Sequence, residues 1–283
     1  MWEANHVWLI FCLVTWWTAF PESFAAMMST LIIPLLLALL GIVLRGASFA
    51  FRKYAASLAQ ARLFGAIFAA SSLITPFFFG CVAGAIASGR VPATGRGSLI
   101  DSWVNPTSIF GGLIAVGTCT FLAGVFLVAD ASRSGAQVLA ERLRTRSLAV
   151  GVLTGLIVFA ALVPIKHDAT TLYDGLTGRA APLIGISAMV GAATLVLLVV
   201  RRYLAARLTA VLAVASVVLG WGVAQYPWLL VDQVSIADAA GSPATLAALL
   251  VVAGLATVIV LPSMAYLYSL TQSEPWTHSP FGS

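Results

Sequence analysis

The first residues of the chain hold a pair of side chains whose types and spacing suggest acid–base chemistry. Glu3 and His6 stand three residues apart in the run WEANHVW, which extends from Trp2 to Trp8. On a helix, residues i and i+3 share a face. A carboxylate beside an imidazole at a membrane entrance could relay protons. The alternative is structural, because the helix dipole alone favours an acid at a helix start. Spacing alone favours this structural explanation.

Residues that could bind a metal or a haem are scarce elsewhere. Haem iron takes His, Met, Cys or Tyr as axial ligands. Of the three histidines, only His6 lies at an apolar segment, since His167 is expected in an outer loop and His278 in a polar tail. The three cysteines stand singly in apolar segments, as small buried hydrophobes do: Cys12, Cys81 and Cys119. The sequence predicts no metal site and no catalytic residue, so any haems of a working complex should sit in a partner.

The elements that position these residues must be membrane helices. Hydrophobic residues make up 60% of the 283 positions and charged residues only 9%, whereas soluble domains carry about 25% charged residues. Segments of about 20 apolar residues can each span a bilayer. We predict an all-α, polytopic membrane helix bundle that forms a single integral domain over residues 1–283, with about eight spans. They are Asn5–Phe20, Ser23–Leu44, Leu63–Ala87, Thr107–Ala129, Leu148–Ile165, Ala181–Val200, Leu208–Tyr226 and Ala244–Leu270.

The distribution of lysine and arginine predicts the orientation of these spans. Assigning successive loops to alternate sides puts eleven basic residues on one side and four on the other. The rich side should face the cytoplasm, which also puts both termini there. The net charge of +5 is explained by this topology and does not indicate nucleic acid. Hardly any charge lies between the span ends, which disfavours an ion-coupled transporter.

Several motifs resemble subunit II of the cytochrome bd-type quinol oxidases. The WEANHVW run is similar to the signature that opens the second transmembrane helix in that family. The likeness continues in order through FPESFA at Phe20–Ala25, LRGASFAFR around Arg45, WVNP at Trp103–Pro106, the arginine-rich run Glu141–Arg146 and the segment Ala237–Leu246. It therefore covers essentially the whole chain. The motif residues expected to have structural roles are Trp2, Asn5, Arg45, Trp103, Asn105 and Pro106.

The resemblance implies a function for a complex rather than for this chain alone. Such a complex oxidises quinol in a bacterial cell membrane and reduces oxygen to water, with protons taken from the cytoplasm. The haem-bearing subunit I would hold haem b and haem d, and a structural quinone occurs in some members. Glu3 matches the acid that the family places at a proton entrance, with His6 beside it. Trp8 would lie near a route for oxygen. Lipid and quinol are further expected partners, and small accessory subunits are left open.

Two departures from the family pattern stand out. Family members have an additional helix before the WEANHVW run, whereas this sequence starts on it. We expect either an upstream start or a chain that lacks that helix. Ala50 also replaces an acid that is frequent in the family, so a salt bridge in that segment is expected to be absent. The alternatives are a transporter or permease-like protein and a non-catalytic assembly scaffold.

Overall fold

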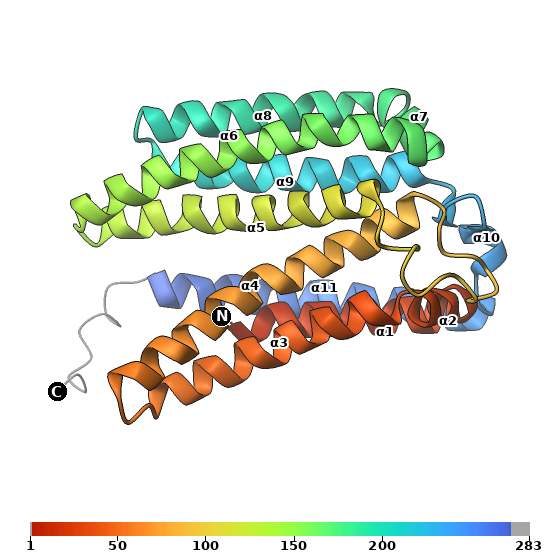
Figure 1. The fold of residues 1–283 in the computed structure, drawn as a ribbon, viewed down its shortest axis with the longest axis horizontal. Coiled ribbons are helices and arrows are strands. Elements are labelled where there is room, and N and C mark those ends of the chain that lie inside the picture. Colours follow the sequence, from red (N-terminus) through yellow and green to blue (C-terminus); the bar gives the residue numbers. More distant parts are fainter. Residues whose placement is uncertain (1, 273–283) are drawn as a thin grey trace. The chain divides into compact units, whose positions relative to one another are not determined.

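The computed structural model describes residues 2–272, without the side chains of residues 2–7, 268, 271 and 272. Within that range nearly all regular structure is helical (Figure 1). The helices are α1 (Trp2–Ala19), α2 (Pro21–Thr30), α3 (Ile32–Lys53), α4 (Leu58–Ala87), α5 (Pro106–Arg133), α6 (Gln137–Asp168), α7 (Thr170–Thr177), α8 (Ala181–Val199), α9 (Tyr203–Gln225), α10 (Ile236–Ala239) and α11 (Pro243–Gln272). Two short strands, β1 (Trp228–Leu230) and β2 (Val234–Ser235), pair antiparallel.

Seven helices of the described chain are long and apolar enough to cross a membrane: α3, α4, α5, α6, α8, α9 and α11. The count rises to eight if α1 and α2, which are joined by a sharp bend, together form one span. This agrees with the predicted all-helical membrane bundle of about eight spans. Only 6% of the most apolar window of α6 is buried within the chain, and none of that of α11, as expected for helices that face lipid or a partner.

The start of the second predicted span was wrong. The prediction ran from Ser23 to Leu44, but Ser23 lies in the short helix α2 and the spanning helix α3 begins at Ile32. Pro21 explains why α2 is separate from α1, because the residue before a proline avoids the helical conformation and proline fits the first position of a new helix. The chain breaks a second time at Leu31, between α2 and α3. Ser23 also stabilises the bend between α1 and α2, since its hydroxyl accepts a hydrogen bond from Trp16 Nε1 at 3.1 Å.

The described chain divides into two compact units. One consists of residues up to Phe24 together with those from Ala239 onward, and the other of residues Ala25–Asp238. In the first unit α1 contacts α11. The backbone N–H of Gly241, just before α11, donates to the carbonyl of Ala19 at 2.8 Å. The two ends of the sequence are thereby joined in one unit.

The larger unit is a bundle of helices that pack against their neighbours in sequence. Contacts join α3 to α4, α4 to α5, α5 to α6 and α8 to α9, and α5 also packs on α9. Glycines allow the closest approach: a Cβ on Gly80 of α4 would overlap the carbonyl of Gly111 on α5. Small residues at such positions are typical of membrane helix interfaces.

Two apolar clusters lie toward opposite ends of this bundle. One contains five buried residues from α4 to α9: Ala87, Ala169, Leu172, Ala180 and Ala224. The other contains five from α5, α8 and α9: Val125, Val128, Leu198, Ala206 and Ala210. The second cluster lies beside the turns that carry most of the charge, so it supports the basic end of the bundle.

Candidate functional site

The basic residues gather at one end of the larger unit. Helices alternate in direction, so the α3–α4, α5–α6 and α8–α9 turns lie together, at the left of Figure 1. These turns and the adjoining helix ends carry Arg45, Arg52, Lys53, Arg62, Arg133, Arg142, Arg144, Arg146, Arg201, Arg202 and Arg207. The opposite end has Arg90, Arg96, Lys166 and Arg179. The asymmetry used to predict orientation is thus a property of the folded bundle.

The proton-relay candidates fall at the start of α1. The helix begins at Trp2 and includes Glu3 and His6 in its first turns. The side chains of Trp2, Glu3, Asn5 and His6 lie outside the described part of the structure. Their proposed roles therefore rest on the sequence and on the helical backbone that carries them.

Trp8 is the first residue of the motif whose side chain is described. Its indole N–H points to the sulfur of Met264 on α11, with 3.4 Å between Nε1 and Sδ. Its ring meets Phe11 edge to face, with 5.9 Å between centroids. Sulfur next to an aromatic ring is a favourable and adaptable contact. Trp8 therefore connects α1 with α11 inside the smaller unit.

Arg45 lies within α3 rather than in the loop where the sequence had placed it. The residue is eight positions before the end of α3, or about 12 Å along the helix. Its guanidinium lies over the ring of Phe68 on α4, 5.2 Å from the centroid. Its Nε is buried and has no hydrogen-bond partner in the described chain. A cation at such a depth needs contacts of this kind, because bare charge is costly in a membrane.

The WVNP motif starts helix α5 at the other end of the bundle. The side-chain oxygen of Asn105 accepts from the backbone N–H of Ser108 at 2.9 Å, and Nδ2 donates to the Ser102 carbonyl at 3.1 Å. Pro106 occupies the first helical turn, where its missing N–H does no harm. Trp103 packs edge to face on Phe78 of α4 at 5.8 Å. The motif caps α5 and holds its start against α4.

His167, which the sequence predicted in an outer loop, lies with Lys166 and Asp168 in the last turn of α6. Asp168 accepts a hydrogen bond from the Thr107 hydroxyl at 3.3 Å. It also lies 4.0 Å from the guanidinium of Arg90. This turn thus connects α6 to the start of α5. Among the described residues, His, Cys, Asp and Glu form no group of three that could hold a metal ion.

A model of the family described as cytochrome bd terminal oxidase subunit II matches residues 1–271. The chain belongs to the cytochrome bd terminal oxidase subunit II family. One relative is cytochrome bd ubiquinol oxidase subunit 2 of Bacillus subtilis (strain 168), which is 28% identical over 194 residues. That alignment covers 68% of this chain and 56% of the Bacillus protein, so it spans little more than half of that relative's length.

A solved structure of bd oxidase from Geobacillus thermodenitrificans contains a chain with the same fold. The TM-score is 0.77, and the likeness covers 96% of this chain and 82% of that chain at 24% sequence identity. The fold of this subunit II family member, a multi-pass membrane helix bundle, is therefore shared with a bd oxidase subunit.

One ion pair of this subunit II chain was not predicted from the sequence. Arg207 of α9, only 5% exposed, pairs with Asp130 of α5 and donates to the Phe126 carbonyl at 2.7 Å. Its guanidinium also faces the Phe126 ring at 5.0 Å. The sequence had assigned both charges to loops beyond span ends. The sequence shows Asp130 directly after one apolar run and Arg207 directly before another. No local pattern indicates that these two residues, far apart in the sequence, form a pair.

Proposed function

We propose that this chain is the second subunit of a bd-type quinol oxidase, an oxidoreductase that oxidises quinol and reduces oxygen to water. The observation that carries the proposal is the family match over residues 1–271. It is supported by the scarcity of candidate haem ligands in the sequence, because only one of the three histidines, His6, lies at an apolar segment. Haem b and haem d would accordingly reside in a haem-bearing subunit I.

This subunit would serve the partner's chemistry by controlling access to it. Oxygen is apolar and enters a bundle of small apolar residues easily, and the Trp8–Met264 contact lies where we propose that oxygen passes. Protons do not cross such a bundle without titratable groups. Glu3, with His6 on the same face of α1, would supply the entrance to a proton path that continues in subunit I.

The orientation of the chain follows from the basic end of the bundle. We propose that this end faces the bacterial cytoplasm, because lysine and arginine are enriched on that side. An even number of spans then returns both termini to the cytoplasm. Glu3, at the start of the first span, would meet protons on the side from which the oxidase takes them. Both compact units would belong to a single integral membrane domain.

The test is a reduced-minus-oxidised visible spectrum of the affinity-purified chain, extracted gently from its native membranes. We expect bands of haem b and haem d, carried by a haem protein that co-purifies. A colourless preparation without a partner, from cells shown to contain an active bd oxidase, would contradict the proposal. It would favour a transporter or an assembly scaffold.

A further inference from the structure

Helix α6 is much longer than its apolar stretch. It runs for 32 residues, or about 48 Å, whereas its apolar stretch, residues 148–165, accounts for about 27 Å. The hydrocarbon core is about 30 Å thick. The first turns of α6, Gln137–Ser147, therefore extend past the hydrocarbon into the headgroup region. These turns carry Arg142, Arg144 and Arg146.

The three arginines of this segment differ in what they contact. Arg144 is engaged within the protein: its Nε donates to the carboxylate of Glu141 at 3.1 Å, and Nη1 reaches the Val199 carbonyl at 3.5 Å. Arg142 and Arg146 are exposed. In the described chain neither has an ion-pair or hydrogen-bond partner. Two cations one helical turn apart are therefore available to something outside the chain.

These two arginines lie on an exposed face of the helix. Positions four and seven apart share a face, which puts Arg142, Arg146 and Leu153 on one stripe. Leu153 and Leu156 are both more than half exposed and continue it toward the middle of the membrane. A lipid whose chains lie along this apolar stripe would bring its phosphate to the level of the arginine pair.

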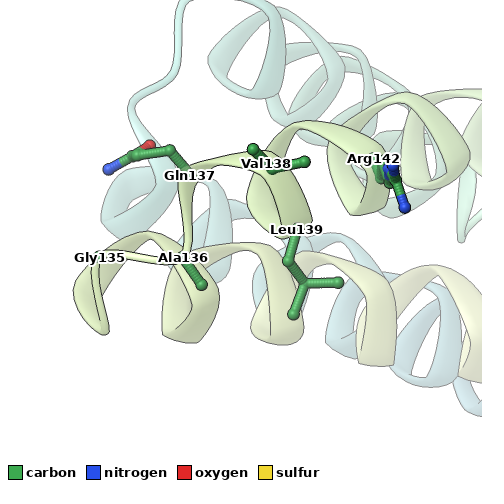
Figure 2. A pocket seen from close by; sticks show the side chains of 6 residues that line it. All are labelled: Gly135, Ala136, Gln137, Val138, Leu139 and Arg142. Atoms are coloured by element: carbon green, nitrogen blue, oxygen red, sulfur yellow. The ribbon is translucent and has the colours of Figure 1, made fainter.

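The N-terminal end of α6 places exposed apolar side chains beyond the arginines. A shallow concavity of about 470 Å³ is formed there by residues 135–139 with Arg142 (Figure 2). Val138, 70% exposed, projects from the first turn of the helix, as Leu139 does on another side (Figure 2). Exposed apolar groups on both sides of a cation pair suit an amphipathic ligand better than a free ion.

We propose that Arg142 and Arg146 on the exposed face of α6 bind the headgroup of an anionic phospholipid from the leaflet at the basic end of the bundle. The charge of the occupant follows from the two guanidinium groups, and its lipid nature from the apolar stripe that continues below them. Each arginine near an anionic surface contributes about 1 kcal/mol. Removing both should weaken binding about thirtyfold.

The probe is dioleoyl phosphatidylglycerol, titrated into the delipidated chain purified with its accompanying proteins, and bound lipid is counted by native mass spectrometry. The wild type should hold phosphatidylglycerol more tightly than dioleoyl phosphatidylcholine. The Arg142→Gln/Arg146→Gln variant should lose that preference. The matched control is Arg62→Gln/Arg202→Gln, which removes the same charge from exposed positions of the same end but leaves the α6 pair intact.

Each outcome decides the proposal. Retention of wild-type affinity by the α6 variant would overturn it, as would an equal loss in the control variant. Displacement of the lipid by inorganic phosphate would show that a free anion occupies the arginines instead. A crosslinker at Ala149, which is exposed on the same stripe, should label lipid, and labelling of a protein would identify this face as a protein interface. The readout is independent of oxidase activity, so failure of the proposed function would leave it interpretable.

Discussion

Glu3 is the side chain on which the proposed proton entrance depends. Replacing it by glutamine keeps its size and removes its titration, so we expect quinol oxidase turnover of the intact complex to fall at least about tenfold. The haem spectrum should stay unchanged, because the haems are proposed to lie in the partner. Oxygen consumption with a quinol donor measures the effect. Glu22→Gln, an exposed acid in the first turn of α2, is the control. Unchanged turnover in Glu3→Gln would remove this residue from the mechanism.

Asn105 makes a prediction about stability. Asn105→Ala removes the acceptor for the Ser108 N–H and the donor to the Ser102 carbonyl. Loss of an N-cap costs about 1 kcal/mol, and the buried position adds an unsatisfied carbonyl. We expect the free energy of unfolding to drop by about 1–2 kcal/mol, measured as a lower thermal midpoint in detergent. Asn105→Asp keeps the cap acceptor and should lose less. Equal midpoints for Asn105→Ala and wild type would show that the cap contributes nothing.

Contacts between residues that are close in the sequence could be predicted, whereas contacts between distant residues could not. The Asn105 cap joins residues three apart and follows a local rule, so the Asn-Pro pair marks a helix start without any structure. The hydrogen bond from Trp8 to Met264 joins residues 256 positions apart. No local pattern specifies it, and it appears only once α1 and α11 have packed.

At the scale of helices, the close packing of α4 against α5 depends on glycine. A Cβ on Gly80 would overlap the backbone of Gly111, and backbone cannot rotate away as a side chain can. Gly80→Ala should force the helices apart and lower the stability by about 1–3 kcal/mol. Gly65→Ala on the same helix meets nothing within 4 Å, so it should be neutral or stabilise by up to about 1 kcal/mol. Thermal midpoints of the two variants compare them, and equal destabilisation would contradict close packing that depends on glycine.

The Arg207–Asp130 pair joins α9 to α5. Substituting one of its two residues should lower the stability more than substituting the other. Asp130→Asn leaves a buried guanidinium without its carboxylate. A fully buried pair would lose 3–5 kcal/mol, but the Asp130 side chain is 56% exposed, so we expect roughly 1–2 kcal/mol. Arg207→Met leaves only a solvated carboxylate and fills the site with apolar atoms, so it should cost less. Denaturation of both variants gives their free energies of unfolding. A larger loss of stability for Arg207→Met than for Asp130→Asn would contradict the view that Arg207 is the buried member of the pair.

Helix identity was readable from hydropathy, but helix ends were not. The apolar runs correctly predicted seven spanning helices, because membrane helices need long apolar stretches: α3, α4, α5, α6, α8, α9 and α11. Hydropathy did not separate α2 from α3, since the residues around Leu31 are as apolar as a span. It also ended the second span at Leu44, although α3 continues to Lys53. A long arginine side chain can lie along apolar surface while its helix continues, so a charge does not by itself mark a helix end.

At the scale of the whole molecule, composition and topology determine how the chain meets its surroundings. All fifteen basic residues fall between positions 45 and 207, within the larger unit. Their division between its two ends follows from the alternation of the helices. The bundle can therefore be oriented by charge before any partner is present.

This orientation can be tested with single cysteines in a background without Cys12, Cys81 and Cys119. Thr94→Cys lies in the α4–α5 loop and Ala56→Cys in the α3–α4 turn, and both positions are exposed. A membrane-impermeant maleimide added to intact cells, with the outer membrane opened where there is one, should label Thr94→Cys. It should label Ala56→Cys only after the inner membrane is permeabilised, because the end that carries eleven of the fifteen basic residues is expected to face the cytoplasm. The opposite labelling would put the basic end outside and would leave Glu3 facing the wrong side to collect cytoplasmic protons. Labelling of both positions in intact cells would instead indicate a mixed topology, in which the charge difference is too small to orient the chain.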